Sequence, residues 1–308
     1  MKRKHLIDSV VKKILTALFR YLFLLAMVFV IFYPLFIKIS STFMSMDDLF
    51  DRTVLLIPRN ATLRNYPDII TMTGYWEAFR NNMILSVGVA LLQTLVAACV
   101  GYGFAKFKFR GKGILFACVL ITLLIPPHTM LTSMFLHFRY FDFWGLLRLI
   151  GQPIRLTDTF IPMFILAATG IGLKNGLYIF VMRQFYRGIP DELLDAGYID
   201  GAGIYGTFAR IVFPLSVSPM LTVFLLSFAW QWTDTFYSGI FYGSRRMLPN
   251  ILNFITIERL NVIEMIVTQL HSVRLNTGIV LIILPLIILF VFAQRYFIQG
   301  IERSGITG

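Results

Sequence analysis

Polar side chains that could bind a solute or a proton stand inside otherwise apolar segments of this 308-residue chain. A polar or ionisable residue in such a segment is costly, so it usually lines a solute pathway or pairs with a neighbouring helix. The residues that fit this description, together with the aromatic and acidic run that closes one apolar segment, are Gln93, His128, Lys174, Trp230, Gln231, Trp232 and Asp234. We take them as the candidate solute-pathway residues.

Lys174 is the most unusual of these residues. It precedes Arg183 by nine positions, which is about 13 Å along a helix with a rise of ~1.5 Å per residue. A lysine that far inside an apolar segment faces a watery cavity, pairs with a carboxylate, or extends its charged end towards the membrane surface. Gly170, Gly172 and Gly176 permit a broken helix nearby. A structural role in helix breaking or pairing is therefore the alternative to a role in solute passage.

The aromatic and acidic run has two interpretations as well. Asp234 follows Pro214 by twenty residues, or about 30 Å of helix, and so belongs at the outer rim of a membrane span. The two tryptophans beside it, Trp230 and Trp232, are then interfacial anchors in preference to platforms for sugar rings.

The remaining polar candidates do not form an enzyme-like cluster. His128 follows Pro126-Pro127, which predicts a kink, and a histidine there is more often a satisfied polar group than a proton relay. We expect Gln93 either to line a solute pathway or to form a hydrogen bond with a neighbouring helix. The four histidines are scattered singly, with no carboxylates at metal or nucleophile spacing, so we expect no metal site and no membrane-embedded enzyme. Their positions are His5, His128, His137 and His271.

Residues 189–214 form a polar, helix-competent segment between two long apolar ones. A proline and two acidic residues at 190–192 suit the first turn of a helix. We expect a short helix over 190–199, a break at 200–203, and a second helical stretch that ends at Pro214. Its compact face could enter a groove in another protein, whereas the alternative is an amphipathic loop on lipid headgroups. That face consists of Leu193, Leu194, Ala196 and Gly197.

Composition places the chain in a bilayer. It is 57% hydrophobic and only 14% charged, well beyond an ordinary soluble domain. A span needs about 20 apolar residues, and the sequence predicts an all-α membrane protein with about six transmembrane helices. The expected spans are Tyr21 to Ile39, Met83 to Ala105, Ile114 to Leu136, Phe160 to Met182, Leu215 to Tyr237 and Gly278 to Phe297. Cys99 and Cys118 lie inside apolar runs, so no disulfide framework follows.

Charge gives the expected orientation. The net charge is +12, but it is distributed among loops and does not gather on one face, which argues against a nucleic-acid partner. Lysines flank the first span and crowd residues 106–112, so the positive-inside rule places those segments, both termini and residues 183–214 in the cytoplasm. We expect an interfacial N-terminal helix at 1–20, one transmembrane domain at 21–300 and a cytoplasmic tail at 301–308, with no cleaved signal.

The polar segment carries a pattern that resembles a known family. Asp195-Ala196-Gly197, Gly201 and Ile211-Val212-Phe213-Pro214 follow the spacing Glu-Ala-Ala, three residues, Gly, nine residues, Ile-x-Leu-Pro. This is similar to the loop by which permease subunits of ATP-binding-cassette importers dock onto their ATPase. The chain resembles the smaller, maltose-type permease of carbohydrate importers over nearly its whole length. The departures are Asp195 for Glu, Gly197 for the second Ala, and Phe213 for Leu.

The resemblance implies a role, partners and a location. The ATPase-coupling residues would be Glu192, Asp195, Ala196, Gly197, Gly201, Ile211 and Pro214. The partners would be a second homologous permease subunit, a cytoplasmic ATPase dimer, an extracytoplasmic solute-binding protein and membrane lipid, in a bacterial cytoplasmic membrane. No Gly-x-x-x-x-Gly-Lys-Ser/Thr loop occurs in the sequence, so we expect no cofactor in this chain and expect the partner ATPase to bind ATP and magnesium.

The solute follows from the resemblance, which implies a carbohydrate and by default a neutral oligosaccharide. The outer-loop arginines and Lys174 suggest the further hypothesis of an acidic oligosaccharide. Two alternatives remain: an importer permease for a non-sugar solute, and a carrier that works alone. The carrier would need paired intramembrane carboxylates, and the expected spans hold almost none.

Overall fold

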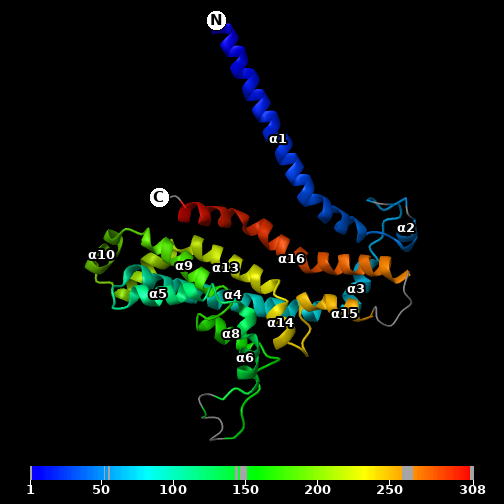
Figure 1. Ribbon diagram of the computed structural model, residues 1–308. Coiled ribbons are helices and arrows are strands. Elements are labelled where there is room, and N and C mark those ends of the chain that lie inside the picture. Colours follow the sequence, from blue (N-terminus) through cyan, green and yellow to red (C-terminus); the bar gives the residue numbers. More distant parts are fainter. Residues whose placement is uncertain are drawn as a thin grey trace. The chain divides into compact units, whose positions relative to one another are not determined.

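Helices make up the regular structure of the residues that the structure describes (Figure 1), apart from one antiparallel bridge, which joins Phe141 and Ile154. The computed structural model describes residues 2–51, 53–54, 56–142, 145, 151–258 and 266–305. Within these ranges the expected all-α class is confirmed. The chain divides into two units, Met1–Thr73 with Leu252–Leu281 and Gly74–Ile251 with Ile282–Gly308.

The first unit begins with one long helix. The helix α1 (Lys2–Ser41) runs for 40 residues without interruption, so the expected N-terminal helix at 1–20 and the first span form one element. Its C-terminal end is fixed by Asn276, whose Nδ2 donates to Ser41 Oγ at 2.9 Å. Two short helices follow, α2 (Met46–Phe50) and α3 (Asn65–Thr73). The unit also holds most of α15 (Ile251–Glu258) and the first part of α16 (Ile266–Gly305).

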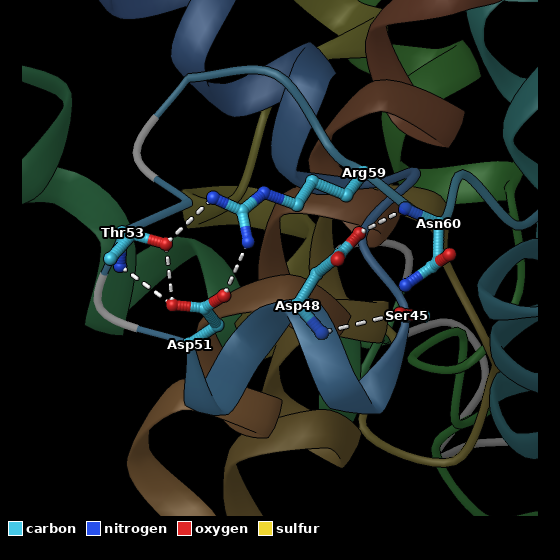
Figure 2. A network of polar contacts seen from close by, with 6 residues as sticks. All are labelled: Ser45, Asp48, Asp51, Thr53, Arg59 and Asn60. Atoms are coloured by element: carbon cyan, nitrogen blue, oxygen red, sulfur yellow. Dashed lines mark hydrogen bonds and ion pairs between the residues drawn. The ribbon is translucent and has the colours of Figure 1, made fainter.

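A network of polar contacts orders the segment between α1 and α3 (Figure 2). The Asp51 carboxylate accepts from the N–H and the hydroxyl of Thr53, at 2.9 and 2.6 Å, and pairs with Arg59 at 3.0 Å. The hydrogen bond from the Thr53 hydroxyl is the main reason that the pKa of Asp51 is lowered. The buried Asp48 carboxylate accepts from Asn60 N at 2.9 Å. The described residues of this segment therefore form a structured loop that contains one short helix, α2.

The second unit is built around α4 (Tyr75–Lys106), which packs chiefly against α9 (Asn175–Arg187), α13 (Val217–Trp232) and α8 (Ile161–Ala168). Small residues allow this close packing. A Cβ on Gly101 of α4 would lie 2.8 Å from Met182 Cβ and 3.0 Å from the backbone nitrogen of Arg183 in α9. Glycine is thus required where these two helices cross.

Two of the expected spans are broken in the structure. The first is divided into α5 (Lys112–Ile121) and α6 (Pro127–Arg139), because Pro126 and Pro127 interrupt the helical hydrogen bonds. The predicted kink at these prolines is confirmed. The second is divided at residues 169–174 between α8 and α9, where Gly170 has φ +79°. Neither 114–136 nor 160–182 is therefore one continuous helix.

Three helical stretches in the described chain are long and apolar enough to cross a membrane. They are Lys12–Ser41, Tyr75–Lys106 and Ser272–Arg295. A fourth follows if Ile204–Leu215 and Val217–Trp232, which are bent by 73°, count as one span. The six-span arrangement stays a prediction, since it requires the two broken spans to cross as well.

The polar segment and the region after α13 hold the remaining short elements. The polar segment forms α10 (Asp191–Ile199), α11 (Ile204–Thr207), the π-helical turn η2 (Phe208–Val212) and α12 (Phe213–Leu215). The predicted short helix, break and second helical stretch are confirmed. Beyond α13 lie α14 (Phe236–Phe241) and η3 (Leu248–Asn250). Of the expected tail at 301–308, residues 306–308 lie outside the described residues.

Candidate functional site

The end of α4 holds the start of α10. Lys106, the last residue of α4, donates from Nζ to the Ile189 carbonyl at 2.5 Å and to the Asp191 carboxylate at 2.6 Å. The Lys106 side chain is only 10% exposed, and its hydrogen bond to Asp191 lowers the pKa of that carboxyl. The entry into α10 is thereby fixed by a charge-assisted contact from a helix more than eighty residues earlier in the chain.

The helix α10 has an exposed face and a buried face. Glu192, Asp195 and Ala196 are exposed, whereas Leu194 and Gly197 are buried. A Cβ on Gly197 would lie 2.7 Å from the Ile211 side chain, so glycine lets α10 approach η2 closely. The compact face expected from the sequence is therefore divided, because Leu194 and Gly197 pack inward and only Leu193 and Ala196 remain exposed.

A glycine ends α10 and sets the direction of the next segment. Gly201 has φ +78°, and the N–H of Ala202 donates to the Gly197 carbonyl at 3.0 Å, a common helix C-terminal arrangement. A substituent at Gly201 would meet open space, so its backbone angle alone calls for glycine. Pro214 lies in α12, next to the 73° bend before α13. Gly201 and Pro214 thus mark the two changes of direction.

Large apolar side chains are exposed on the polar segment as well. Ile199 is 85% exposed and Tyr205 is 90% exposed. Among the described residues Asp195 has no ion-pair partner. The exposed surface of the segment thus combines acidic and apolar side chains, which is what a groove on another protein would bury.

Four of the candidate solute-pathway residues gather at the break between α8 and α9. Gln93 of α4 donates from Nε2 to the Leu173 carbonyl at 3.0 Å and accepts from the Ser227 hydroxyl of α13. Lys174 Nζ lies 5.1 Å from the centre of the Trp230 ring. Gln231 is buried and lines a small cavity with Gln93 and Leu173, with room for about one water molecule. The break is therefore joined to α4 and α13 by polar and aromatic contacts.

The other three candidates lie elsewhere. Trp232 is fully buried, its Nε1 donates to the Ile282 carbonyl at 3.0 Å, and its ring stacks on Phe228 at 5.3 Å. The structure thus corrects both interpretations of Trp232, since a ring closed in on all sides is neither an interfacial anchor nor a sugar platform. The Asp234 carboxylate accepts from the N–H groups of Phe236, Tyr237 and Ser238 at the start of α14.

The structure places His128 at the start of α6. Its ring is exposed and makes an edge contact with Phe236, with ring centres 3.9 Å apart. Its role as a satisfied polar group stays a prediction.

One polar cluster was not indicated by the sequence. Asp158 has φ +66°, unusual for a residue other than glycine. Its carboxylate accepts from Ser244 N at 3.0 Å and pairs with Arg155 at 2.7 Å, and its carbonyl accepts from Arg245 Nε. These contacts tie the loop before α8 to the loop after α14. Because Ser244 and Arg245 lie more than eighty residues from Asp158, no local pattern could reveal the connection between the two loops.

Comparison with known proteins gives a family match. The model of the family described as binding-protein-dependent transport system inner membrane component matches residues 93–303. The chain is 28% identical over 285 residues to the arabinooligosaccharides transport system permease protein of Halalkalibacterium halodurans, with 91% of this chain and 92% of the relative covered. It is 28% identical over 302 residues to the maltodextrin transport system permease protein of Bacillus subtilis, with coverages of 96% and 98%.

A solved structure has the same fold. It is the crystal structure of a bacterial ABC transporter involved in the import of the acidic polysaccharide alginate, and it matches with a TM-score of 0.73. The match covers 92% of this chain and 96% of the other chain. Sequence identity is 20%, so this likeness concerns the fold alone.

Proposed function

The chain belongs to the family of inner membrane components of binding-protein-dependent transport systems, and from this we propose that it is a permease subunit of an ATP-driven importer for oligosaccharides. In this proposal the chain does not hydrolyse ATP. A cytoplasmic ATPase dimer binds ATP and magnesium, and a solute-binding protein delivers the oligosaccharide to this chain and to a second, homologous permease subunit.

The carbohydrate assignment is supported by the relatives. Those named for arabinooligosaccharides and maltodextrin are similar over more than nine-tenths of both chains, and one from Rhizobium meliloti is named for alpha-glucosides. A relative from Synechocystis is named for osmoprotective compounds, which keeps a non-sugar solute as the second candidate. We favour oligosaccharides because the matches to two of these three sugar-named relatives cover more than nine-tenths of both chains.

One observation supports the coupling role. The polar segment exposes acidic and apolar side chains, and a contact from α4 holds the start of this segment in place. Glu192, Asp195, Ile199 and Tyr205 point outward, while Lys106 holds the entry of α10. We propose that this surface enters a groove of the ATPase and that the groove offers a basic group to Asp195. Closure of the ATPase dimer then moves α10, and Gly201 and Pro214 transmit the movement to α13.

The solute pathway would follow from that movement. We propose alternating access, in which the helices of this subunit and its mate open first to the solute-binding protein and then to the cytoplasm. Residues at the break between α8 and α9 would line this pathway. Six crossings, with both termini and residues 183–214 in the cytoplasm of a bacterial cell, complete the proposed arrangement.

The test uses the complex of both permeases and the ATPase, purified with its solute-binding protein. We expect ATP hydrolysis to rise when the binding protein is loaded with oligosaccharide. Asp195→Arg should reduce both the ATPase recovered with the permeases and uptake into proteoliposomes by about tenfold or more, since two like charges would meet in the groove. Asp195→Glu keeps the charge and serves as the matched control. Normal assembly and uptake in Asp195→Arg would count against the docking role.

A further inference from the structure

The break between α8 and α9 is a fixed, non-helical piece of backbone in the second unit. Lys174 itself adopts φ +61°, a conformation that costs free energy for a residue with a side chain and is found at functional sites. Gln93 holds the break from α4 through the Leu173 carbonyl, and Ser227 of α13 holds Gln93 in turn. Irregular backbone at membrane depth is tolerated where it is buried in protein or lines a watery cavity.

The charge of Lys174 has an aromatic partner but no anionic one. Its Nζ lies 5.1 Å from the centre of the Trp230 ring, within the range of a cation–π contact. In the part of the chain that the structure describes, Lys174 forms no ion pair with a carboxylate. A cation in a membrane segment without a counter-charge is costly, so an anion that arrives there is bound favourably.

Both side chains are partly exposed. Lys174 is only half-buried, and Trp230 keeps 47% of its surface exposed. An aromatic ring packs against the apolar faces of a sugar ring, and an ammonium group donates hydrogen bonds to a carboxylate. Fixed at 5.1 Å from one another, the two groups together match a sugar that carries a carboxylate, whereas a neutral sugar would leave the charge uncompensated.

We propose that Lys174 and Trp230 form a binding subsite for a uronic acid residue of the transported oligosaccharide. Lys174 Nζ contacts the sugar carboxylate, Trp230 packs against the sugar ring, and Gln93 keeps the break in place. This inference rests on the proposed function and narrows its substrate class to acidic oligosaccharides.

The test compares two substrates in proteoliposomes that contain the whole complex and its binding protein. One is a uronate oligosaccharide, and the other is the same oligosaccharide with its carboxyl groups reduced to alcohols. We expect the wild type to favour the uronate, and Lys174→Met to lower the ratio of the two kcat/KM values by about tenfold or more. Lys174→Arg should restore much of the ratio, and Trp230→Leu should reduce uptake of both substrates. Lys13→Met, at an exposed lysine of α1, is the matched control.

The possible outcomes separate the inference from the function on which it rests. A complex that takes up neither substrate, and whose ATPase ignores the loaded binding protein, would contradict the proposed function. A working complex that prefers the reduced oligosaccharide would overturn only the acidic subsite. An equal loss for both substrates in Lys174→Met, at normal yield of the assembled complex, would also overturn it, because the effect of Lys174 would then not depend on the sugar carboxylate.

Discussion

At the scale of single residues, Asp158 shows how one carboxylate can organise two loops. Its backbone N–H donates to the Phe241 carbonyl at 2.8 Å, while its side chain accepts from Ser244 and pairs with Arg155. The pKa of Asp158 is lowered, first by the hydrogen bond from the Ser244 N–H and also by the charge of Arg155. The folded protein therefore favours the ionised carboxylate.

The resulting pH dependence has a definite sign. Because the folded-state pKa lies below the ordinary value of 3.8, the stabilisation is complete above that value and is lost as pH falls through the lower folded-state pKa. Asp158→Asn keeps the shape and tolerates the positive φ but removes the charge. We expect it to destabilise the solubilised complex by about 1 kcal/mol at neutral pH. The difference in Tm between the two proteins should shrink as the pH falls below 3.8, and a difference that grew on acidification would contradict this account.

Residue identity showed which side chains were unusual, but it did not show their neighbours. The sequence marked Lys174 as a lysine in an apolar segment and Trp230 as part of an aromatic run, yet 56 positions separate them and no local period joins them. The prediction that Trp232 is an interfacial anchor was wrong because it relied on sequence position alone. Aromatic residues near a span end are commonly interfacial, and only the packing of Phe228 and Phe79 around this ring makes it interior.

At the scale of elements, the polar segment was predictable and its attachment was not. Local signals determine α10, since an acidic first turn opens it and Gly201 ends it. The contact that fixes α10 to α4 comes from Lys106, a residue whose charge we used only to infer orientation. A long-range ion pair leaves no trace in local composition, so such contacts require the folded structure.

We predict that α10 loses order when the contact from Lys106 is removed. In Lys106→Met the Ile189 carbonyl and the Asp191 carboxylate lose their donor, and we expect the amides of residues 191–199 to exchange hydrogen about threefold faster or more in the assembled complex. Lys106→Arg should preserve most of the protection. Lys108→Met is the control, since Lys108 acts on Asp191 only through its charge. Unchanged exchange in Lys106→Met would show that packing alone positions α10.

At the scale of the whole molecule, apolar length and helix continuity give different numbers of crossings. The sequence predicts six spans from apolar runs, whereas three continuous helices, or four with the bent pair, are long and apolar enough in the described chain. The difference arises at Pro126-Pro127 and at residues 169–174, where each expected span is divided into two shorter helices. Hydropathy does not register such breaks, because the residues on both sides remain apolar.

The three arrangements place the same loops on different sides of the membrane. With the N-terminus in the cytoplasm, three crossings leave residues 151, 203 and 243 together on the cytoplasmic side. Four crossings move only residue 243 outside. Six crossings put residues 151 and 243 outside and residue 203 inside. Gly151, Gly203 and Gly243 suit this test, because a side chain added at any of them would meet open space.

We therefore predict the labelling pattern of single cysteines in a chain whose Cys99 and Cys118 have been replaced by alanine. In right-side-out vesicles a membrane-impermeant maleimide should label Gly151→Cys and Gly243→Cys but not Gly203→Cys, and inside-out vesicles should give the reverse. Labelling of all three after detergent treatment controls for accessibility. If Gly151→Cys reacted on the same side as Gly203→Cys, the divided spans would not cross the bilayer. The six-crossing arrangement, which puts residues 183–214 on the opposite side from the outer loops, would then be wrong.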